Sequence, residues 1–444
     1  MKRLSTLMAV VIVTLGLVIA GGIAGASTRS ATSEKPTATD IGVSATEIRI
    51  AVIADVDNPF APGLFQGSVD AVNGAAKTIN QQGGIGGRKV VVDFIDSHLN
   101  PNESRNAVIT ACQNDFAMVG GASLFLTSVD DEVSCKDKAG NAIGLPDIGG
   151  IVTGIPQQCS PVSFPANPPQ ILCDTKAQSP QTYQGQQGAA KWFLKNINKN
   201  LKGPNILPND TKDAFRGDKV QALVNIQAGI KQTQEVTHSG KDPQSAYTSV
   251  VQQMKTDGSN FAFDGLAYAN MIEFQQEAAL QGVTGVTYQC TTACYDKKYI
   301  ADGGASAEGT YIWTAFLPFE EANTNPAMKT MVKNVGADKV TGLGLYSYIA
   351  GMAFQQVMND VVTKQGVNAV TRQNLLDGLK KLTSFNAGGI IGTVDIANKK
   401  TSPCFVLIQV KNGKFVRVSP SKKGTFDCTK SNYATVQSDL INGS

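Results

Sequence analysis

The stretch from Ile48 to Asp96 begins with the apolar run IRIAVIADV and ends with a second apolar run, KVVVDFID. Between the two runs, apolar residues such as Val69, Val72 and Ile79 recur three or four positions apart, which is the spacing of one helix face. Both runs are nearly continuous and rich in β-branched residues, as strands buried on both faces are. The stretch therefore predicts strand, helix, strand, the unit of an α/β fold with a parallel sheet and crossover helices.

A glycine-rich segment, NQQGGIGGR at residues 80–88, lies after this helix and before the second strand. Glycines at that place end a helix and turn the chain. A dinucleotide-binding loop needs its glycines between strand and helix, where pyrophosphate meets the helix N-terminus. Here that loop, residues 54–63, reads ADVDNPFAPG. The glycines therefore shape the scaffold and do not form a phosphate site.

The composition of the chain bounds its domain count and disfavours nucleic acid as a partner. Its 444 residues are enough for two domains with sizeable cores. The formal net charge is only +3 and is spread without long basic runs, so nothing in it favours nucleic acid as a partner.

The N-terminus is typical of an exported protein. Lys2 and Arg3 precede an apolar run from Leu7 to Ile23, and a small-x-small cleavage pattern follows at residues 24–26. Residues 1–26 are therefore expected to be a signal peptide. The length of the apolar run leaves an uncleaved membrane anchor as the alternative. No cysteine near the cleavage point could carry a lipid, and residues 27–46, rich in Ser, Thr and Ala, are expected to be a disordered linker.

Eight cysteines in an exported chain favour disulfides over free thiols. Many connectivities are possible, and we choose the sequential one because each loop then stays within one predicted unit. The expected pairs are Cys112 with Cys135, Cys159 with Cys173, Cys290 with Cys294, and Cys404 with Cys428. A zinc site is not expected, because no second cysteine pair accompanies the CxxxC motif and the chain has only two histidines.

Three further segments have clear local patterns. Asn100 followed by Pro101 and Glu103 predicts a helix start. The prolines at positions 204 and 208 interrupt the expected strand in LKGPNILPND, which predicts an edge strand or an irregular one. Near the end, the turn at residues 411–414 contains Asn-Gly between two apolar runs and predicts a β-hairpin.

The sequence offers little catalytic equipment. Neither His98 nor His238 lies beside a Ser or Cys in a nucleophile motif, and Gly240-Lys241 is followed by Asp242 instead of a magnesium-binding hydroxyl. We therefore expect no enzyme activity and no cofactor. An exported protein with two α/β lobes and no catalytic groups points to ligand binding, at the carboxyl ends of the strands.

Several segments together resemble the type I periplasmic binding proteins of the leucine/isoleucine/valine-binding class. They are INQQGGIGGRKVVVDFID with the NPNESRNAV helix, FDGLAYANMIEFQQEAALQG, SAEGTY and GLYSYIAGMAF, within roughly residues 46–418. The resemblance implies two Rossmann-like lobes joined by a three-crossover hinge, capture of a ligand by hinge closure, and delivery to an ABC permease in the membrane.

We expect the lobes to divide the chain in an interleaved way. Lobe 1 is expected to hold residues 47–180 and 318–384, lobe 2 residues 181–317 and 385–430, and residues 431–444 are expected to be a C-terminal tail.

The topology and the resemblance together name candidate ligand-binding residues in the loops at the strand ends. The resemblance implies that Ser123 meets a ligand carboxylate and that the segment with Gly150, Ile151 and Thr153 holds the same carboxylate. Tyr268 matches an aromatic residue after a lobe 2 strand, and Phe60 lies where the family often has an aromatic lid. Each of Ser123, Tyr268, Thr153 and Phe60 also has an ordinary structural alternative, as a cap, core or loop residue.

One departure from the family concerns the ligand ammonium. Amino-acid binders balance that charge with a Glu on the second lobe, but the matching position here is Thr292 or Ala293. A buried ammonium without a carboxylate partner is strongly penalised. Either Asp296 takes over this role, or the ligand is not an α-amino acid.

The leading hypothesis is a monomeric, extracytoplasmic solute-binding protein for amino-acid, amide or related transport by an ABC importer. The alternative is a membrane-anchored sensor or regulatory ectodomain, which the long apolar N-terminal run suggests. An exported enzyme using Asp296 and Tyr295 is the third hypothesis.

Overall fold

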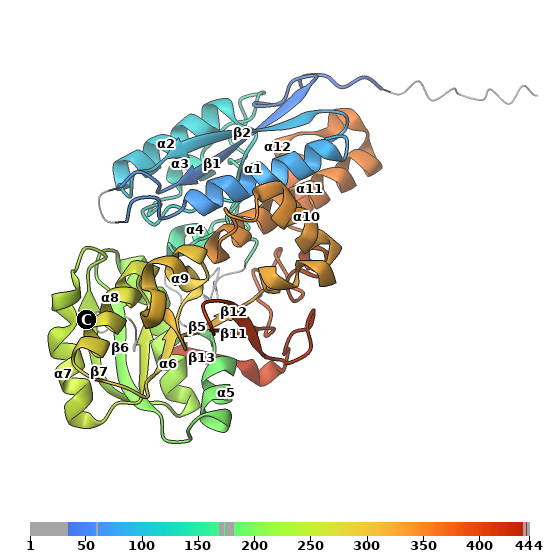
Figure 1. Ribbon diagram of the computed structural model, residues 1–444. Helices are drawn as coiled ribbons and strands as arrows, with labels where there is room; N and C mark the ends of the chain where they lie inside the picture. The colour runs from blue at the N-terminus through green and yellow to red at the C-terminus, as the bar shows by residue number, and fades with distance from the viewer. Residues whose placement is uncertain (1–33, 59–60, 168–172, 174–181, 438–440, 442–444) are drawn as a thin grey trace, which may run out of the picture. The chain divides into compact units, whose positions relative to one another are not determined.

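The computed structural model describes residues 34–58, 61–167, 173, 182–437 and 441, and residues 35–444 form one compact unit. Within this unit the strands form a four-stranded sheet, a seven-stranded sheet and a short two-stranded sheet (Figure 1). We call the four-stranded sheet with its helices lobe 1 and the seven-stranded sheet with its helices lobe 2. Both larger sheets are mainly parallel, as predicted.

The sheet of lobe 1 has the order β2-β1-β3-β4, and all of its strands are parallel. Residues Ile48 and Val90 are direct partners in the first strand pair, which confirms the predicted strand-helix-strand unit. Its strands and the first helices are β1 (Glu47–Ala54), α1 (Gln66–Gln81), β2 (Lys89–Asp96), α2 (Pro101–Asn114), β3 (Ala117–Val119), α3 (Asp130–Val133), β4 (Asp147–Ile148) and α4 (Ile155–Cys159).

The glycine-rich segment turns the chain as predicted. Gly84 has a φ of 75°, and a Cβ there would lie 2.0 Å from the carbonyl oxygen of Arg88. Ile85 and Arg88 close the turn by an antiparallel bridge. Only glycine combines this backbone conformation with so close an approach.

The predicted helix start at Asn100 is also confirmed. The Asn100 side chain accepts hydrogen bonds from the backbone N–H groups of Asn102 and Glu103, and Pro101 is the first residue of α2. These contacts satisfy two of the N–H groups that a helix start leaves without partners.

Three later helices return to lobe 1: α10 (Pro326–Val335), α11 (Gly342–Gln365) and α12 (Arg372–Leu379). Figure 1 shows α11 beside α1, although some 270 residues separate them in the chain. The two helices approach closely, because a Cβ on Gly351 would lie 2.5 Å from the Cβ of Ala75. A hydrogen bond of 2.8 Å between the hydroxyls of Thr78 and Tyr348 also joins them.

The sheet of lobe 2 has the order β12-β11-β10-β9-β8-β6-β7. Its strands are β6 (Lys202–Pro208), β7 (Lys231–His238), β8 (Phe261–Asp264), β9 (Thr287–Cys290), β10 (Tyr311–Thr314), β11 (Val406–Val410) and β12 (Phe415–Ser419). Its helices are α5 (Gly188–Asn196), α6 (Lys212–Ala228), α7 (Thr248–Asp257), α8 (Tyr268–Leu280) and α9 (Lys297–Gly303). The chain therefore passes between the lobes three times: after β4, after β10 and before β11.

The position of strand β6 differs from the edge position that its prolines suggested. It lies between β8 and β7 and is not an edge strand, but its register shifts between Gly203 and Pro204, so the expected irregularity is present. Pairing with β8 involves only Asn205 and Ile206. The two prolines flank this short pairing, and their missing N–H groups remove none of its bonds.

The predicted hairpin joins β11 and β12. Lys411 and Lys414 exchange two backbone hydrogen bonds, and Asn412 and Gly413 both have a positive φ, of 53° and 64°. A turn with two such residues matches the twist of the flanking strands.

The two ends of the described chain differ from the expected linker and tail. In the part of the expected linker from residue 35 on, Asp40 and Val43 are buried, and the carbonyl oxygen of Thr37 accepts a hydrogen bond from Arg88. At the other end, β13 (Tyr433–Gln437) pairs with β5 (Thr182–Gln186) in an antiparallel sheet. Both segments therefore pack on the lobes, whereas the other domain boundaries stay predictions.

The signal peptide and the alternative anchor, residues 1–26, lie outside the described residues. Among the residues that are described, no helix has the length and apolar character needed to span a membrane.

The cysteines form the four sequential disulfides that we predicted: Cys112–Cys135, Cys159–Cys173, Cys290–Cys294 and Cys404–Cys428. The sequence separation within a pair is at most 24 residues, so each disulfide closes a local loop.

Candidate ligand-binding cavity

A cavity of about 380 Å³ is lined by loops and helix ends of both lobes. This volume lies within the range of about 300–1,000 Å³ that is usual for small-molecule sites. Much of its wall is apolar, with Leu64, Phe65, Leu99, Leu124, Leu266 and Leu343 among the lining residues. Several loops that follow parallel strands contribute, as expected for ligand sites in open α/β sheets.

The Asp55 carboxylate, directly after β1, holds together the lobe 1 loops that reach the cavity. It accepts hydrogen bonds from the Ser97 hydroxyl at 2.6 Å and from the N–H groups of Leu99 at 2.9 Å and Leu124 at 2.8 Å. Asp55 is fully buried, and burial raises its pKa while these hydrogen bonds lower it. Both leucines line the cavity, so Asp55 sets the position of that part of the wall.

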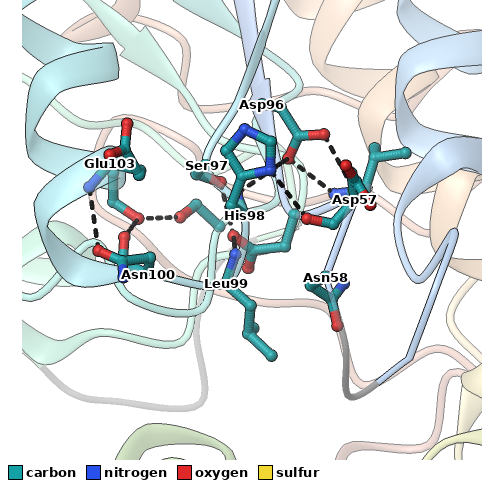
Figure 2. A network of polar contacts seen from close by, with 12 residues as sticks. Asp57, Asn58, Asp96, Ser97, His98, Leu99, Asn100 and Glu103 are labelled. Carbon is teal, nitrogen blue, oxygen red and sulfur yellow. Dashed lines mark hydrogen bonds and ion pairs between the residues drawn. The ribbon is translucent and has the colours of Figure 1, made fainter.

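A second carboxylate, Asp96 at the end of β2, orders the neighbouring loop (Figure 2). It accepts hydrogen bonds from the N–H groups of Val56, Asp57 and His98. The His98 ring lies 2.8 Å from the carbonyl oxygen of Asp57, a contact that raises the pKa of this exposed imidazole. His98 and Leu99 both have a positive φ, near 50°, which turns Leu99 toward the cavity wall. The network is structural and supplies no catalytic pair.

Four lining residues carry buried polar atoms that have no hydrogen-bond partner among the described residues: Thr153 Oγ1, Gln158 Oε1, Tyr183 Oη and Gln221 Oε1. Tyr183 and Gln221 are only 1 % and 4 % exposed. An unpaired buried polar group costs about 1–3 kcal/mol. Unpaired atoms that gather around one cavity mark it as the place where a ligand can supply the missing partners.

The lobe 2 side of the cavity carries its charged residues. Arg216 forms an ion pair with Asp213, one turn earlier on α6. Asp210 accepts hydrogen bonds from the Ser239 hydroxyl at 2.7 Å and the Gly240 N–H at 2.6 Å. Among the described residues Asp218 has no such partner, and burial followed by the charge of Asp264 raises its pKa well above the usual value.

The Cys290–Cys294 disulfide closes a loop whose three inner residues, Thr291, Thr292 and Ala293, all line the cavity. Thr292 is buried against α11, because a Cβ on Gly342 would lie 2.7 Å from its methyl group. The disulfide therefore fixes one wall of the cavity.

Four of the candidate ligand-binding residues line the cavity: Gly150, Ile151, Thr153 and Thr292. Ser123, Tyr268 and Asp296 are not among its lining residues. The Ser123 hydroxyl is buried in a 2.9 Å hydrogen bond with Ser104 of α2. Tyr268 is the first residue of α8 and packs against the core, and its neighbours Leu266 and Ala267 line the cavity instead.

Asp296 caps α9 by accepting the N–H of Lys298, so it does not supply the acidic group in the cavity. Phe60 lies outside the described residues. Since the structure holds no ligand, the ligand-binding role of every candidate stays a prediction.

Sequence reasoning missed the lining residues of β5 and α6, above all Tyr183, Asp218 and Gln221. One signal was present, because Asp218 and Gln221 lie three positions apart and so share a helix face. Nothing local, however, indicates which face of α6 meets the ligand. Among the described residues, no cluster of histidine, cysteine, aspartate or glutamate could hold a metal ion.

Comparison with known proteins agrees with this geometry. The sequence profile of the family described as "periplasmic binding protein" matches residues 47–414. The chain belongs to the periplasmic binding protein family. The match covers most of the chain, and it supports the resemblance, the two-lobed fold and an extracytoplasmic location. A search of curated protein sequences found no match.

Solved structures of several periplasmic binding proteins share the fold. The fatty acid ABC transporter substrate-binding protein of Thermomonospora curvata has a TM-score of 0.66 at 15% identity, over 89% of this chain and 98% of that one. The leucine-binding protein LivK of Thermotoga maritima has a TM-score of 0.62 at 18% identity, over 84% of this chain and 98% of that one. LivJ of Streptococcus pneumoniae, in complex with isoleucine, has a TM-score of 0.63 at 14% identity, over 84% of this chain and all of that one. At such low sequence identities the structural similarity establishes the fold and leaves the solute open.

Proposed function

We propose that this periplasmic binding protein captures a small amphipathic solute between its lobes and delivers it, as a monomer, to an ABC permease. The observation that carries the proposal is the cavity itself. It combines an apolar wall with buried polar atoms that lack partners, and both lobes contribute to it. The described residues that line it include no catalytic pair, so binding without chemical conversion is the role that they support.

The solute is not an ordinary branched-chain amino acid in this proposal. The position that bears an acidic residue in amino-acid binders is occupied by Thr292 or Ala293, and Asp296 is engaged as a helix cap. The N–H groups of Gly150 and Ile151, where a ligand carboxylate was expected, both donate to the carbonyl oxygen of Gly121. The two charged ends of a free amino acid therefore lack their usual partners.

Scattering and thermal melting with candidate solutes test the proposal. The panel contains amino acids, amides, aromatic acids and alkylamines. We expect at least one class to reduce the radius of gyration, by closing the lobes, and to raise the melting temperature by mass action. If no compound of any class produces either change, the protein is not a solute carrier of this kind.

A further inference from the structure

The charged residues that line the cavity are three aspartates, Asp210, Asp213 and Asp218, and one arginine, Arg216. The chain as a whole has a formal net charge of +3, so the acidic character is local to this wall. Arg216 is already paired with Asp213, and Asp210 is held by Ser239 and Gly240. Asp218 is the aspartate of this wall that remains without a hydrogen bond or ion pair among the described residues.

The backbone around Asp218 leaves its carboxylate room to face a ligand. Gly265, which directly follows the buried Asp264, also lines the cavity. A Cβ at position 265 would lie 2.5 Å from Cγ of Asp218, so any side chain there would displace the carboxylate. Asp264 is fully buried, and its Oδ2 has no partner among the described residues, which leaves a second carboxyl oxygen close behind Gly265.

Two glutamine side chains in the wall are fixed as hydrogen-bond acceptors. The amide nitrogen of Gln221 donates to the carbonyl oxygen of Gln186 at 3.1 Å and to the side-chain oxygen of Asn225 at 3.0 Å. The amide nitrogen of Gln158 donates to the carbonyl oxygens of Val152 and Thr153, both at 2.9 Å. Since both N–H bonds of each amide are used, only the side-chain oxygens remain, and both are unpaired.

Several groups that were expected to hold a ligand carboxylate are engaged elsewhere. The N–H groups of Gly150 and Ile151 donate to Gly121, and the Ser123 hydroxyl bonds Ser104. The cavity therefore offers acceptor oxygens without partners and the Asp218 carboxyl, whose ionised form a ligand cation would stabilise, so a ligand with donors and positive charge fits it.

We propose that the cavity binds an amphipathic organic amine, whose ammonium group lies against Asp218, Gln221 and Tyr183. The apolar part of the amine packs against the leucines of the opposite wall, including Leu124 and Leu343. The ammonium has three donors, which match the Asp218 carboxylate, the Gln221 oxygen and the Tyr183 hydroxyl oxygen. This inference rests on the proposed solute-binding function and adds the class of solute.

Matched series of n-alkyl compounds with four to eight carbons test the inference. Each chain length is used as the ammonium, the alcohol and the carboxylate, so that only the head group changes. Calorimetry with the full-length mature protein should give tightest binding for the ammonium compounds. In the isosteric variant Asp218→Asn, their affinity should fall about 10- to 100-fold, the loss expected for a hydrogen bond to a charged group. Affinity for the alcohols should change less than about 3-fold on the same scale.

Asp360→Asn is the control, because this aspartate of α11 has an exposed side chain that pairs with Lys364 and does not line the cavity. It should leave amine affinity unchanged. Tighter binding of the carboxylates, no measurable binding of any amine, or an Asp218→Asn variant that binds amines normally would each overturn the inference. Lobe closure with another solute class would then preserve the solute-binding function while excluding this head group.

Discussion

Replacing Tyr183 by phenylalanine removes one hydroxyl from the cavity wall and should affect the empty and the liganded protein in opposite ways. Tyr183 is 1 % exposed, and its hydroxyl has no partner among the described residues. Burial raises the pKa of this hydroxyl, which therefore stays neutral at physiological pH. The empty protein loses solvation of the hydroxyl and gains no hydrogen bond in return.

The size of each effect follows from hydrogen-bond energetics. An unpaired buried group costs about 1–3 kcal/mol, so the free energy of unfolding of the empty Tyr183→Phe protein should rise by about 1 kcal/mol. For a lobe of this size, that corresponds to a melting temperature about 2–4 °C higher. A hydrogen bond to the ligand contributes about 0.5–1.5 kcal/mol, so affinity should fall by about 2- to 10-fold.

Thermal melting of the ligand-free protein and calorimetry with the tightest-binding panel solute measure both effects. Tyr247→Phe is the matched control for binding, because the Tyr247 hydroxyl is also buried but Tyr247 does not line the cavity. Its affinity should equal that of the unchanged protein. A lower melting temperature of empty Tyr183→Phe, together with unchanged affinity, would refute the view that this hydroxyl waits for a ligand.

Three further predictions concern stability and the cavity wall. Burial raises the pKa of Asp264 to about 7, so the folded protein holds this proton more tightly than the unfolded chain, and stability falls as pH rises from about 4 to 7. Asp264→Asn should remove up to about 4 kcal/mol of that fall. Denaturation curves at pH 4 and 8 measure it, and an equal loss of unfolding free energy between these pH values in both proteins would contradict the prediction. Replacing Cys290 and Cys294 by serine should cost about 2 kcal/mol of stability and weaken binding several-fold, by freeing the loop between them; unchanged affinity in calorimetry would exclude that effect. Deleting residues 433–444 removes β13, the partner of the strand that carries Tyr183. Ligand binding should weaken, while lobe 1 keeps its hydrogen-exchange protection. Full affinity of the shortened protein would show that β13 does not position the site.

The parts of the fold that the sequence predicted are those fixed by local chemistry. The strand-helix-strand unit, the Asn100 cap and the Asn412-Gly413 turn each follow from a few neighbouring residues. The position of β6 inside its sheet could not be predicted in this way. Its prolines are tolerated because β8 pairs only with Asn205 and Ile206, which lie between them, and that register is a property of two strands far apart in the sequence.

For the cavity too, the sequence predicted residues that depend on local position and missed those that depend on packing. Gly150, Ile151, Thr153 and Thr292 follow strand ends, which the α/β topology places at the ligand edge. Ser123 also follows a strand, but its hydroxyl bonds Ser104 on a neighbouring helix, a choice made by packing.

The lobe 2 wall depends on contacts between separate elements of the chain as well as within one helix. Tyr183 is held in a sheet with Val436, and the Gln221 amide is oriented by Gln186 and Asn225. No local pattern in the sequence could show that these side chains surround one cavity.

Mass spectrometry of the native protein, purified without denaturation from its own cells, tests most directly that this cavity captures a small solute. The account predicts one bound molecule per chain, with an apolar body and a basic nitrogen, which is released on unfolding. In Ala293→Trp, which adds a large side chain to the cavity wall, that mass should be lost while the melting curve remains cooperative. Equal occupancy in this variant would place the solute elsewhere and contradict the account.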